Sequence, residues 1–533
     1  MRIAMKAVRT STILTALGLA LTLTACQASP TATSTHETST LRLAETNEYE
    51  TLNPLEYTFS ITSKFYDSLV AVGADGLEPQ LAAQMPTAND DLTVWTVKLR
   101  DGITFSDGSD FDADDVVAAY SSVLAPETAS PLRGDYQLVT GIEATDPSTV
   151  TFTLSAPYAA FPSLLTLGIP AAEKVGGSIL DSSLAREPVG TGPYVLAEWQ
   201  QGTSLTLQAR EDYWRGKPAV ENIYIGFVSD ENARAQRLLG GDFDGAQLSP
   251  LAAAQLDGKQ GLEMFVNPSG DYRGITLPQS SPLFTDPNVR VALNVGTDRQ
   301  AMVDGILAGH GTAIATPITP SFGAVYNPDA TFAYDPERAA ALLDAAGWTA
   351  GSDGTRSKDG TPFSFEVMYF AEDTVRRDLA QAFASDMAKL GIQVQLTAVD
   401  RTQAKQRIAD TPFVLGGGDV PYDPDTQIYG TLHSSFASYD PTDPYSNPSQ
   451  YRNPAVDALL DKARSEADDD ARAADYRELQ TLLIADPAGI DLFAVDHTYV
   501  ARGLDQYTNV EHVVEPHEHG VAWGPWWNVA DWR

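Results

Sequence analysis

Strand-like and helix-like segments alternate along this chain from about residue 41 to its end. Alternating apolar and polar residues predict strands at 41–44, 94–99, 149–154, 204–208 and 392–396. Apolar residues at helical spacing predict helices at 61–70, 112–120, 335–346, 379–390, 455–464 and 471–484. No short-period repeat is present, and 533 residues suffice for more than one core. The alternation therefore indicates an α/β protein with mixed sheets.

Turn and capping residues indicate where several of these helices and strands begin or end. Asp101-Gly102 and Asp107-Gly108 flank a short apolar run and predict a small hairpin between them. Asp112 precedes one helical segment as a capping residue, and Asp335-Pro336 opens another in the same way. Gly347 is the expected end of that second helix.

The chain has one cysteine, Cys26, and a formal net charge of −36. One cysteine excludes an intramolecular disulfide, so stability must come from packing. The negative charge argues against nucleic acid or an anionic membrane surface as the main partner, because both require a positive face. Keeping an extracellular protein dispersed is one explanation of the charge, and attracting cationic ligands is another.

Residues 1–25 have the pattern of a signal peptide. Arg2, Lys6 and Arg9 form a basic start, and an apolar stretch without charge follows from Ile13 to Ala25. That stretch is too short to span a bilayer as a helix. No twin-arginine pair is present, so we expect ordinary Sec export.

The cysteine lies at the end of this segment, in Leu23-Thr24-Ala25-Cys26. The sequence resembles a bacterial lipobox, in which the cysteine is acylated, for instance with palmitate, and becomes the mature N-terminus. An incidental cysteine is the alternative. Residues 26–40 are small and polar and predict a flexible tether. We therefore expect an extracytoplasmic protein anchored to the cell membrane by a lipid.

Four sequence blocks follow one another along the rest of the chain: 95–108 (WTVKLRDGITFSDG) with 111–117 (FDADDVV), 188–194 (PVGTGPY) with 212–218 (DYWRGKP), 284–294 (FTDPNVRVALN) with Asp298-Arg299, and 334–337 (YDPE) through 345–348 (AAGW). Together they resemble the peptide/nickel (oligopeptide-type, family 5) extracellular solute-binding proteins of ABC importers. Any one block would be weak, but four in sequence behind a lipobox identify the family. Physically, most of these residues are expected to be scaffold, such as Trp95 and Phe105 in the core.

The resemblance implies a two-lobed periplasmic-binding-protein type II fold with an extra subdomain in the first lobe. The expected boundaries are 41–272 for the first lobe, with the extra subdomain at about 77–186, 273–494 for the second lobe, and 495–533 for a C-terminal segment that returns to the first. It also implies a monomer without cofactor that captures small peptides and docks on a permease, which an ATPase subunit drives. Ligand binding would favour closure because the ligand contacts both lobes.

The stretch 416–425 (GGGDVPYDPD) is the most informative about the ligand. Three glycines after a strand bring the backbone close to another group, such as a ligand. In dipeptide-binding relatives a Gly-Asp pair before Asp-Pro places a carboxylate on the peptide's amino group, and Gly418-Asp419 matches it with one extra residue. Asp419 therefore either anchors an amine or caps a turn. Gly418, Tyr422 and Trp523 are the further ligand-binding residues that we expect, and packing in the core of the first lobe is the alternative for Trp523.

Nickel-binding relatives carry a similar Pro-Tyr-Asp-Pro with a histidine about a dozen residues later, and here His433 follows it. Imidazole suits Ni²⁺ and other late transition metals. His517 and His519 lie in a second histidine-rich stretch beside glutamates. Binding of nickel or another metal as a chelate for import is thus the alternative function, and an exposed or structural role is the alternative for each histidine.

Enzymatic motifs are missing from the sequence. There is no G-x-S-x-G, H-E-x-x-H or phosphate-binding G-x-x-x-x-G-K pattern, and no cysteine nucleophile within the expected mature domain. We therefore expect a protein that is not an enzyme, with a secreted hydrolase as a remote alternative. A receptor that senses the ligand without transport is a further alternative, which neighbouring permease and ATPase genes would distinguish.

Overall fold

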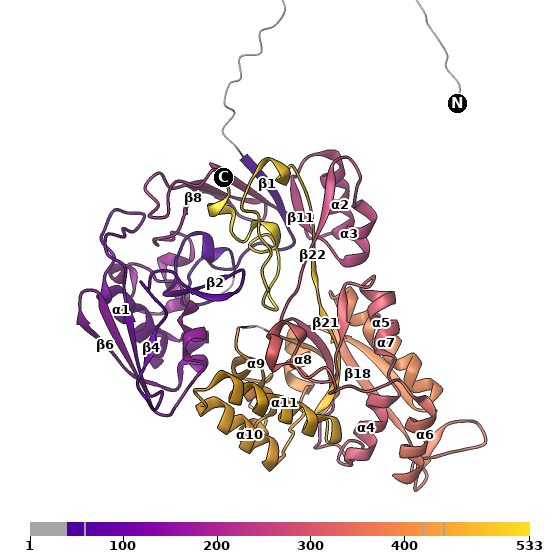
Figure 1. Ribbon diagram of the computed structural model, residues 1–533. Helices are drawn as coiled ribbons and strands as arrows, with labels where there is room; N and C mark the ends of the chain where they lie inside the picture. Colours follow the sequence, from indigo (N-terminus) through magenta and orange to yellow (C-terminus); the bar gives the residue numbers. More distant parts are fainter. Residues whose placement is uncertain (1–39, 58–59, 419–421, 441–442) are drawn as a thin grey trace, which may run out of the picture. The chain divides into compact units, whose positions relative to one another are not determined.

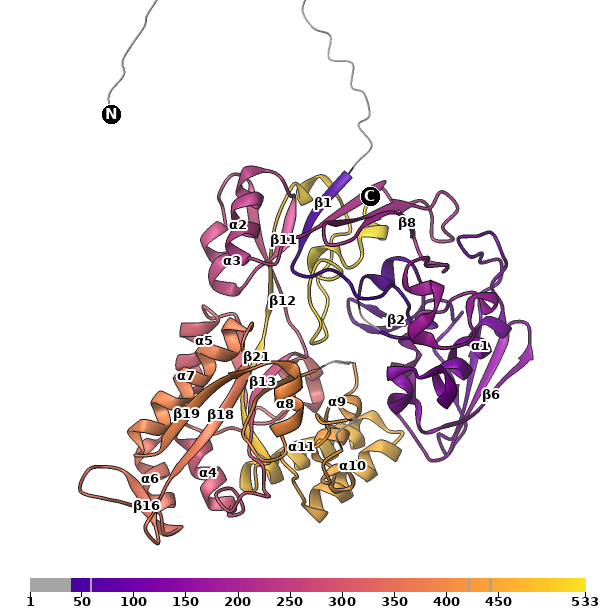
Figure 2. The same ribbon diagram turned by 180° about the vertical axis from the view of Figure 1, so that it is seen from behind.

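The computed structural model describes residues 40–57, 60–418, 422–440 and 443–533. Figures 1 and 2 show the chain from two opposite sides. Two sheets organise most of these residues, and we call the part built on the larger sheet the first lobe and the part built on the other the second lobe.

The sheet of the first lobe has seven described strands in the order β12-β22-β11-β1-β10-β9-β8. Their bounds are β1 Thr40–Glu45, β8 Tyr194–Gln200, β9 Ser204–Ala209, β10 Asn222–Phe227, β11 Gly245–Gln247, β12 Leu262–Asn267 and β22 His497–Arg502. β1 runs parallel to both neighbours, whereas the outer pairings are antiparallel. β22 comes from the far end of the chain, so the C-terminal segment belongs to this lobe.

Both faces of this sheet are covered. Helices α2 (Glu231–Gly240) and α3 (Pro250–Leu256) pack against one face around Leu238 and Leu256. The C-terminal segment packs on the other face, where Trp526 and Trp532 are fully buried. Aromatic rings of this size bury enough apolar area to hold the segment in place without a disulfide.

The extra subdomain has its own core around α1 (Ala113–Leu124) and a four-stranded antiparallel sheet. The strands follow the order β4-β5-β7-β6, with bounds β4 Thr87–Ala88, β5 Val94–Lys98, β7 Thr149–Leu154 and β6 Val139–Asp146. Asp112 caps α1 in a capping box with Asp115, which satisfies backbone N–H groups at the helix start. A hairpin of β2 (Val70–Gly73) and β3 (Gly76–Pro79) lies beside this core.

The second lobe is built on the sheet β14-β21-β13-β20. The strand bounds are β13 Tyr272–Thr276, β14 Gly311–Ala313, β20 Val414–Gly417 and β21 Gly489–Val495. The parallel pair β18 (Ser364–Phe370) and β19 (Gln393–Val399) adjoins it through the bridge between Met368 and Phe413. Helices packed on these strands have the bounds α4 Pro287–Val295, α5 Arg299–Ile306, α6 Pro336–Ala345, α7 Thr374–Lys389 and α8 Arg401–Arg407.

A separate helical layer completes the second lobe. It consists of α9 (Pro424–Leu432), α10 (Pro454–Ser465) and α11 (Asp469–Ala485), which share a core with Tyr451 and Tyr476. A small antiparallel sheet extends from α6, with bounds β15 Thr349–Ala350, β16 Arg356–Lys358 and β17 Thr361–Pro362. These elements lie in the lower half of Figure 1.

Most sequence-predicted elements are confirmed. α1, α6, α10 and α11 occur where the apolar periodicity places them, and Gly347 ends α6 with a φ of +86°. α7 begins at Thr374, five residues before its predicted start. The hairpin expected around Ile103 is reduced to one bridge between Thr104 and Asp110.

The predicted helix at 61–70 is wrong. It is only a 3-10 turn, Ile61–Lys64, followed by β2. The reason is tertiary: the buried Asp67 carboxylate accepts hydrogen bonds from Thr191 and Trp214, far along the chain. These bonds hold this segment in an extended form that local periodicity does not indicate.

Candidate functional site

The chain passes between the two lobes twice. The first crossing joins β12 to β13, and the second joins β21 to β22 through Asp496. The Ser269 hydroxyl donates to the Val495 carbonyl at 2.5 Å, and the Val495 N–H donates to the Asp271 carbonyl at 2.8 Å. The two crossings are therefore hydrogen-bonded to each other and can act as one hinge.

The C-terminal segment runs alongside the first crossing. Glu515 pairs with Ser269 in a parallel bridge, and its N–H and C=O bond to the backbone of Pro268 and Gly270 at 2.9 and 2.8 Å. Two residues further on, the His517 N–H donates to the Gly418 carbonyl at 2.9 Å. Three distant parts of the chain thus meet at the hinge.

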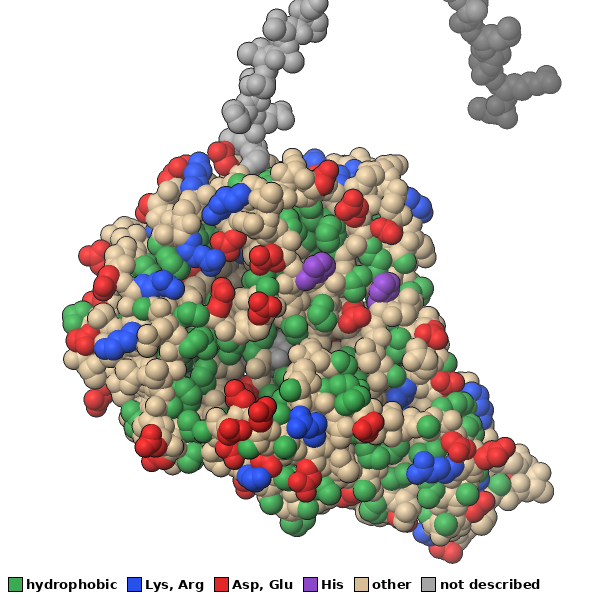
Figure 3. All heavy atoms as spheres, in the orientation of Figure 1, with side chains coloured by type: hydrophobic (Ala, Val, Ile, Leu, Met, Phe, Trp, Pro, Cys, Tyr) green, Lys and Arg blue, Asp and Glu red, His purple; other side chains and the backbone are tan. Residues whose placement is uncertain are grey.

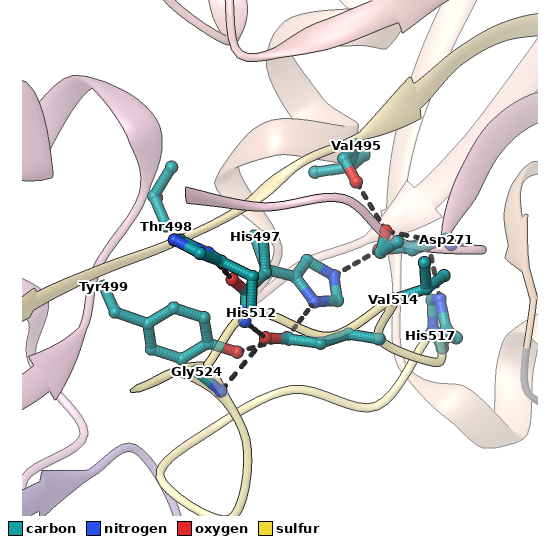
Figure 4. A network of polar contacts seen from close by, with 12 residues as sticks. Asp271, Val495, His497, Thr498, Tyr499, His512, Val514, His517 and Gly524 are labelled. Atoms are coloured by element: carbon teal, nitrogen blue, oxygen red, sulfur yellow. Dashed lines mark hydrogen bonds and ion pairs between the residues drawn. The ribbon is translucent and has the colours of Figure 1, made fainter. Parts of the chain in front are cut away.

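A buried polar network fills the hinge (Figure 4). The His497 ring lies between two carboxylates, with Nε2 3.2 Å from Asp271 Oδ2 and Nδ1 2.8 Å from Glu515 Oε2. Glu515 also accepts from the Tyr499 hydroxyl at 2.5 Å and from the Asn267 amide at 2.5 Å. The side chains of Asp271 and Glu515 are fully shielded from solvent.

This arrangement fixes the charge of His497. An ionised carboxylate only accepts hydrogen bonds, so both ring nitrogens must donate and the ring is an imidazolium. Burial opposes this charge, but the hydrogen bonds to Asp271 and Glu515 raise the His497 pKa to about 9. Burial would likewise raise the pKa of Asp271, yet Arg273 and the two histidines His517 and His497 hold it well below its usual range.

We expect the contribution of His497 to the free energy of unfolding to fall as pH rises from about 6.5 to 9. The unfolded pKa of His497 is 6.5 and its folded pKa is about 9. A raised folded pKa gives stability that is complete below 6.5 and is lost as pH passes the folded value, about 3 kcal/mol here. Urea unfolding at pH 6, 7.5 and 9.5 measures this change in the free energy of unfolding. Lys64, whose pKa burial lowers to about 7, changes stability in the opposite sense above pH 7, so the profile is also measured in Lys64→Met. A flat profile in Lys64→Met would show that His497 is not charged in the fold.

Two buried arginines lie next to the hinge in the second lobe. Arg273 on β13 pairs with Asp271 and lies 3.4 Å from His517 Nδ1. Arg376 in the first turn of α7 pairs with Asp373 at 3.3 Å and stacks on the Phe370 ring. Burial and the positive charge of Arg273 lower the pKa of Arg376 to about 10, so it remains charged at neutral pH.

Each arginine has one buried donor, its Nε, that stands out among the described residues. Among the described residues, the buried Nε atoms of Arg273 and Arg376 have no hydrogen-bond partner. A buried donor without a partner costs about 1–3 kcal/mol, and two like charges held together add to that cost. The pair is thus suited to receive an acceptor that carries negative charge.

The three glycines of the Gly-rich stretch approach protein atoms. A Cβ on Gly416 would lie 2.7 Å from an Arg273 nitrogen and 2.8 Å from an Arg376 nitrogen. A Cβ on Gly417 would meet the Tyr272 ring, and Gly418, with a φ of +112°, would meet the Gly270 backbone. The close approach predicted from the sequence is therefore to the hinge and the arginine pair.

Strand β20 is an edge strand. Within the described part of the chain it pairs with β13 on one side, and on the other side only Phe413, just before it, bridges to β18. Gly416 and Gly417 are half-exposed. An edge of this kind offers backbone N–H and C=O groups to an added strand, directly beside the arginine pair.

A cavity of about 700 Å³ lies in the first lobe between the β2–β3 hairpin and the C-terminal segment. Trp523, expected from the sequence to contact ligand, forms part of its wall and is 7% exposed. Lys64 also lines it and donates to the carbonyls of Trp526 and Trp527 at 3.1 and 2.7 Å. Burial lowers the pKa of Lys64 to about 7. Acidic side chains gather over this region in Figure 3.

A second cavity, of about 250 Å³, separates the extra subdomain from the second lobe. Tyr422 lines it together with Trp95 and Arg472, and the Tyr422 hydroxyl donates to the Val514 carbonyl at 3.2 Å. Beside it the Ala159 N–H donates to the Arg464 carbonyl at 2.9 Å, so the two parts touch. Of the predicted ligand-binding residues, Asp419 lies outside the described residues, as does the lipidation residue Cys26.

The predicted metal ligands lie in two places. His433 ends α9, stacks on Tyr429 and bonds to the Ser435 hydroxyl at 2.7 Å. His517 belongs to the hinge network, with Nδ1 2.6 Å from Asp271 Oδ1, and the exposed His519 stands edge-on to His497. Across the described residues, no three His, Cys, Asp or Glu side chains are grouped to hold a metal ion by themselves.

Sequence reasoning missed the main polar features of the site. Arg273, Arg376 and His497 each lie in a segment without a recognisable motif, and they meet only in the folded chain. The histidine-rich stretch near the C-terminus was a usable signal, because its Glu515 and His517 reach the hinge.

Comparisons with known proteins identify the family. Residues 76–471 match the family model of bacterial extracellular solute-binding proteins, family 5. Protein XP55 of Streptomyces lividans is 39% identical over 463 residues, which cover 85% of this chain and 83% of that protein. The chain belongs to this family. A family 5 solute-binding protein of this kind is the extracytoplasmic substrate-binding subunit of an ABC importer, as the sequence motifs predicted.

Two further relatives differ in their ligands. The glutathione-binding protein GsiB of Salmonella paratyphi A is 28% identical over 82% of this family 5 protein and 85% of its own length. The crystal structure of NikZ from Campylobacter jejuni in complex with Ni(L-His) superposes with a TM-score of 0.81 at 25% identity, covering 93% and 99% of the two chains. The predicted two-lobed type II fold is therefore confirmed. No helix among the described residues of this family 5 protein is both long and apolar enough to cross a membrane.

Proposed function

We propose that this protein captures small peptides that bear a free carboxylate and delivers them to its importer. The observation that carries the proposal is the edge of β20 beside the buried pair Arg273 and Arg376. An extended peptide would add to the backbone of Gly416 and Gly417, and a carboxylate would meet the unmet arginine donors. Main-chain contacts of this kind accept varied side chains, as a nutrient importer requires.

The residues predicted from the sequence complete this proposal. Gly418 and Asp419 would extend the binding edge, with Asp419 holding the ligand's amino group. Tyr422 lines the cavity between the extra subdomain and the second lobe, and Trp523 lines the larger cavity of the first lobe. The relationship to the glutathione-binding protein GsiB supports a peptide, because glutathione is a tripeptide with carboxylates.

A metal chelate is the second candidate ligand. His517 places Nδ1 on Asp271, the arrangement that orients a histidine for metal binding through its other nitrogen. The relative NikZ binds nickel as Ni(L-His). A chelating molecule would supply most of the metal's ligands, so one histidine of the protein would be enough to complete the coordination. Carboxylates of the chelating molecule would bind to Arg273 and Arg376. His433 and His519 are the other ligands to be tested.

The remaining parts of the proposal concern location and partners. Residues 1–25 would be removed as a signal peptide, Cys26 would carry the lipid, and 26–40 would form the tether. The protein would act as a monomer, without cofactor and without enzymatic activity, and would dock on permease subunits driven by an ATPase. Loss of membrane association in Cys26→Ser would test the anchor, measured by fractionation of cells that express the chain.

We expect peptides to raise the unfolding temperature of the purified protein, after unfolding and refolding to remove carried-over ligand. The ligands to be tested are tripeptides with a free carboxylate, the same tripeptides with an amidated C-terminus, and Ni²⁺ with and without L-histidine. A ligand at 100 times its Kd adds about 2.7 kcal/mol of stability. A shift with free but not amidated peptides supports the proposal. A shift only with nickel and histidine, lost in His517→Ala, would replace it with the chelate function.

A further inference from the structure

The cavity of about 700 Å³ in the first lobe has an excess of acid. Asp75, Glu78 and Glu511 line it and are exposed, and none of them makes an ion pair within the described part of the chain. Asp75 and Glu78 lie on the turn and second strand of the β2–β3 hairpin, and Glu511 lies on the C-terminal segment opposite. The three carboxylates therefore face the cavity from two separate walls.

The cationic groups of the same cavity are already engaged. Arg215 pairs with Asp531 at 3.0 Å, and Lys64 donates to two backbone carbonyls. Arg533 donates to the carbonyls of Ala530 and Trp532 at 3.2 and 2.8 Å. The described lining residues comprise five acidic side chains, Asp67, Asp75, Glu78, Glu511 and Asp531, against these three basic ones, so the cavity keeps an excess of negative charge.

The walls also suit a cation that has an apolar stem. Trp523 and Trp527 line the cavity, and the faces of indole rings attract ammonium and guanidinium groups. Long aliphatic stems pack well against such rings while their charged ends reach polar groups. The volume is large enough for a side chain of lysine or arginine together with the backbone that carries it.

We infer that this cavity receives a basic side chain of the captured ligand, so that the protein prefers peptides containing lysine or arginine. The inference rests on the proposed peptide function and narrows its substrate class. The carboxylate of the peptide lies on the arginine pair of the second lobe, and its cationic side chain lies among Asp75, Glu78 and Glu511 of the first. A peptide with both charges then contacts both lobes and favours closure.

The test compares lysine with norleucine, which has a side chain of similar length without the charge. Calorimetric titration uses Lys-Ala-Ala, Ala-Lys-Ala and Ala-Ala-Lys against their norleucine counterparts, in 20 mM and 300 mM NaCl. We expect at least one lysine peptide to bind ten-fold or more tightly than its counterpart at low salt. The preference should shrink at high salt, because the acidic rim is partly exposed.

Variants locate the preference. Glu78→Gln/Glu511→Gln should reduce the lysine preference to three-fold or less while leaving norleucine peptides unchanged. Glu337→Gln, an exposed position in the first turn of α6, is the matched control and should keep it. A preference that survives in the double variant, or equal binding of lysine and norleucine peptides, overturns the inference but leaves peptide capture standing. Failure of every peptide to bind overturns both.

Discussion

Glu515→Gln should lower the free energy of unfolding by about 3–5 kcal/mol at pH 7. Removing one partner of a buried ion pair leaves the other charge uncompensated, which accounts for a loss of this size. The imidazolium of His497 loses its nearer carboxylate, at 2.8 Å. The Glu515 carboxylate accepts hydrogen bonds from the Tyr499 hydroxyl at 2.5 Å and from the Gly524 N–H at 3.0 Å. The amide NH₂ of a glutamine cannot accept such bonds, so one donor would face another.

Urea unfolding followed by circular dichroism measures this effect. Glu518→Gln is the matched control, since Glu518 lies three residues away on the same segment, is half-exposed, and should change stability by less than 0.5 kcal/mol. A second readout is the pH profile, because the pKa of His497 falls when one of its two carboxylates is removed. The stability lost between pH 6.5 and 9 should therefore be smaller in Glu515→Gln. Equal urea midpoints for the variant and the unchanged protein would contradict the network.

Arg376→Gln should weaken binding of carboxylate-bearing peptides by about 100-fold. Truncating one partner of a buried, hydrogen-bonded charge pair costs about 2–5 kcal/mol of affinity. A glutamine keeps much of the shape but offers no charge and no paired donors to a carboxylate. The peptide affinity of Arg376→Lys should lie between those of the unchanged protein and Arg376→Gln, because lysine keeps the charge but lacks the planar guanidinium.

The adjacent Arg377 provides the control. It is exposed and bonds to its neighbour Asp378 at 2.9 Å, so Arg377→Gln should bind peptides normally. Arg376 lies against the like charge of Arg273, which lowers its pKa. Its removal relieves this repulsion, so the unliganded Arg376→Gln protein should unfold at the same temperature or higher. A folded Arg376→Gln protein with unchanged peptide affinity would exclude the arginine pair from the site.

The arginine pair illustrates how a binding site can be kept ready without ligand. Holding Arg273 and Arg376 together, with Nε atoms that bond to none of the described residues, costs stability that the rest of the fold supplies. A ligand carboxylate recovers part of this cost on binding, so its contribution to affinity is larger than that of a surface ion pair. The hinge network is the opposite case, since Asp271 and Glu515 there share the charge of His497 without any ligand.

The sequence by itself determined the family of this protein and several of its helices and strands. The helices α1, α6, α10 and α11 carry their boundaries in local capping residues and apolar spacing, and such signals act within a few residues of the chain. The family blocks are likewise contiguous. The same local logic failed at 61–70, where Asp67 bonds to residues more than one hundred positions away.

Only the tertiary structure decided where the polar site lies. Asp271, His497 and Glu515 come from three segments, and each is an ordinary acidic residue or histidine in its own sequence context. Their roles depend on burial and on distances below 3.5 Å, which no local pattern encodes. The glycines at 416–418 show the same division: the sequence indicated a close approach, and the fold decided that the approach is to Arg273, Tyr272 and Gly270. Local sequence preferences determine helices and strands. Electrostatic interactions between residues far apart in the sequence are determined only when the folded chain brings those residues together.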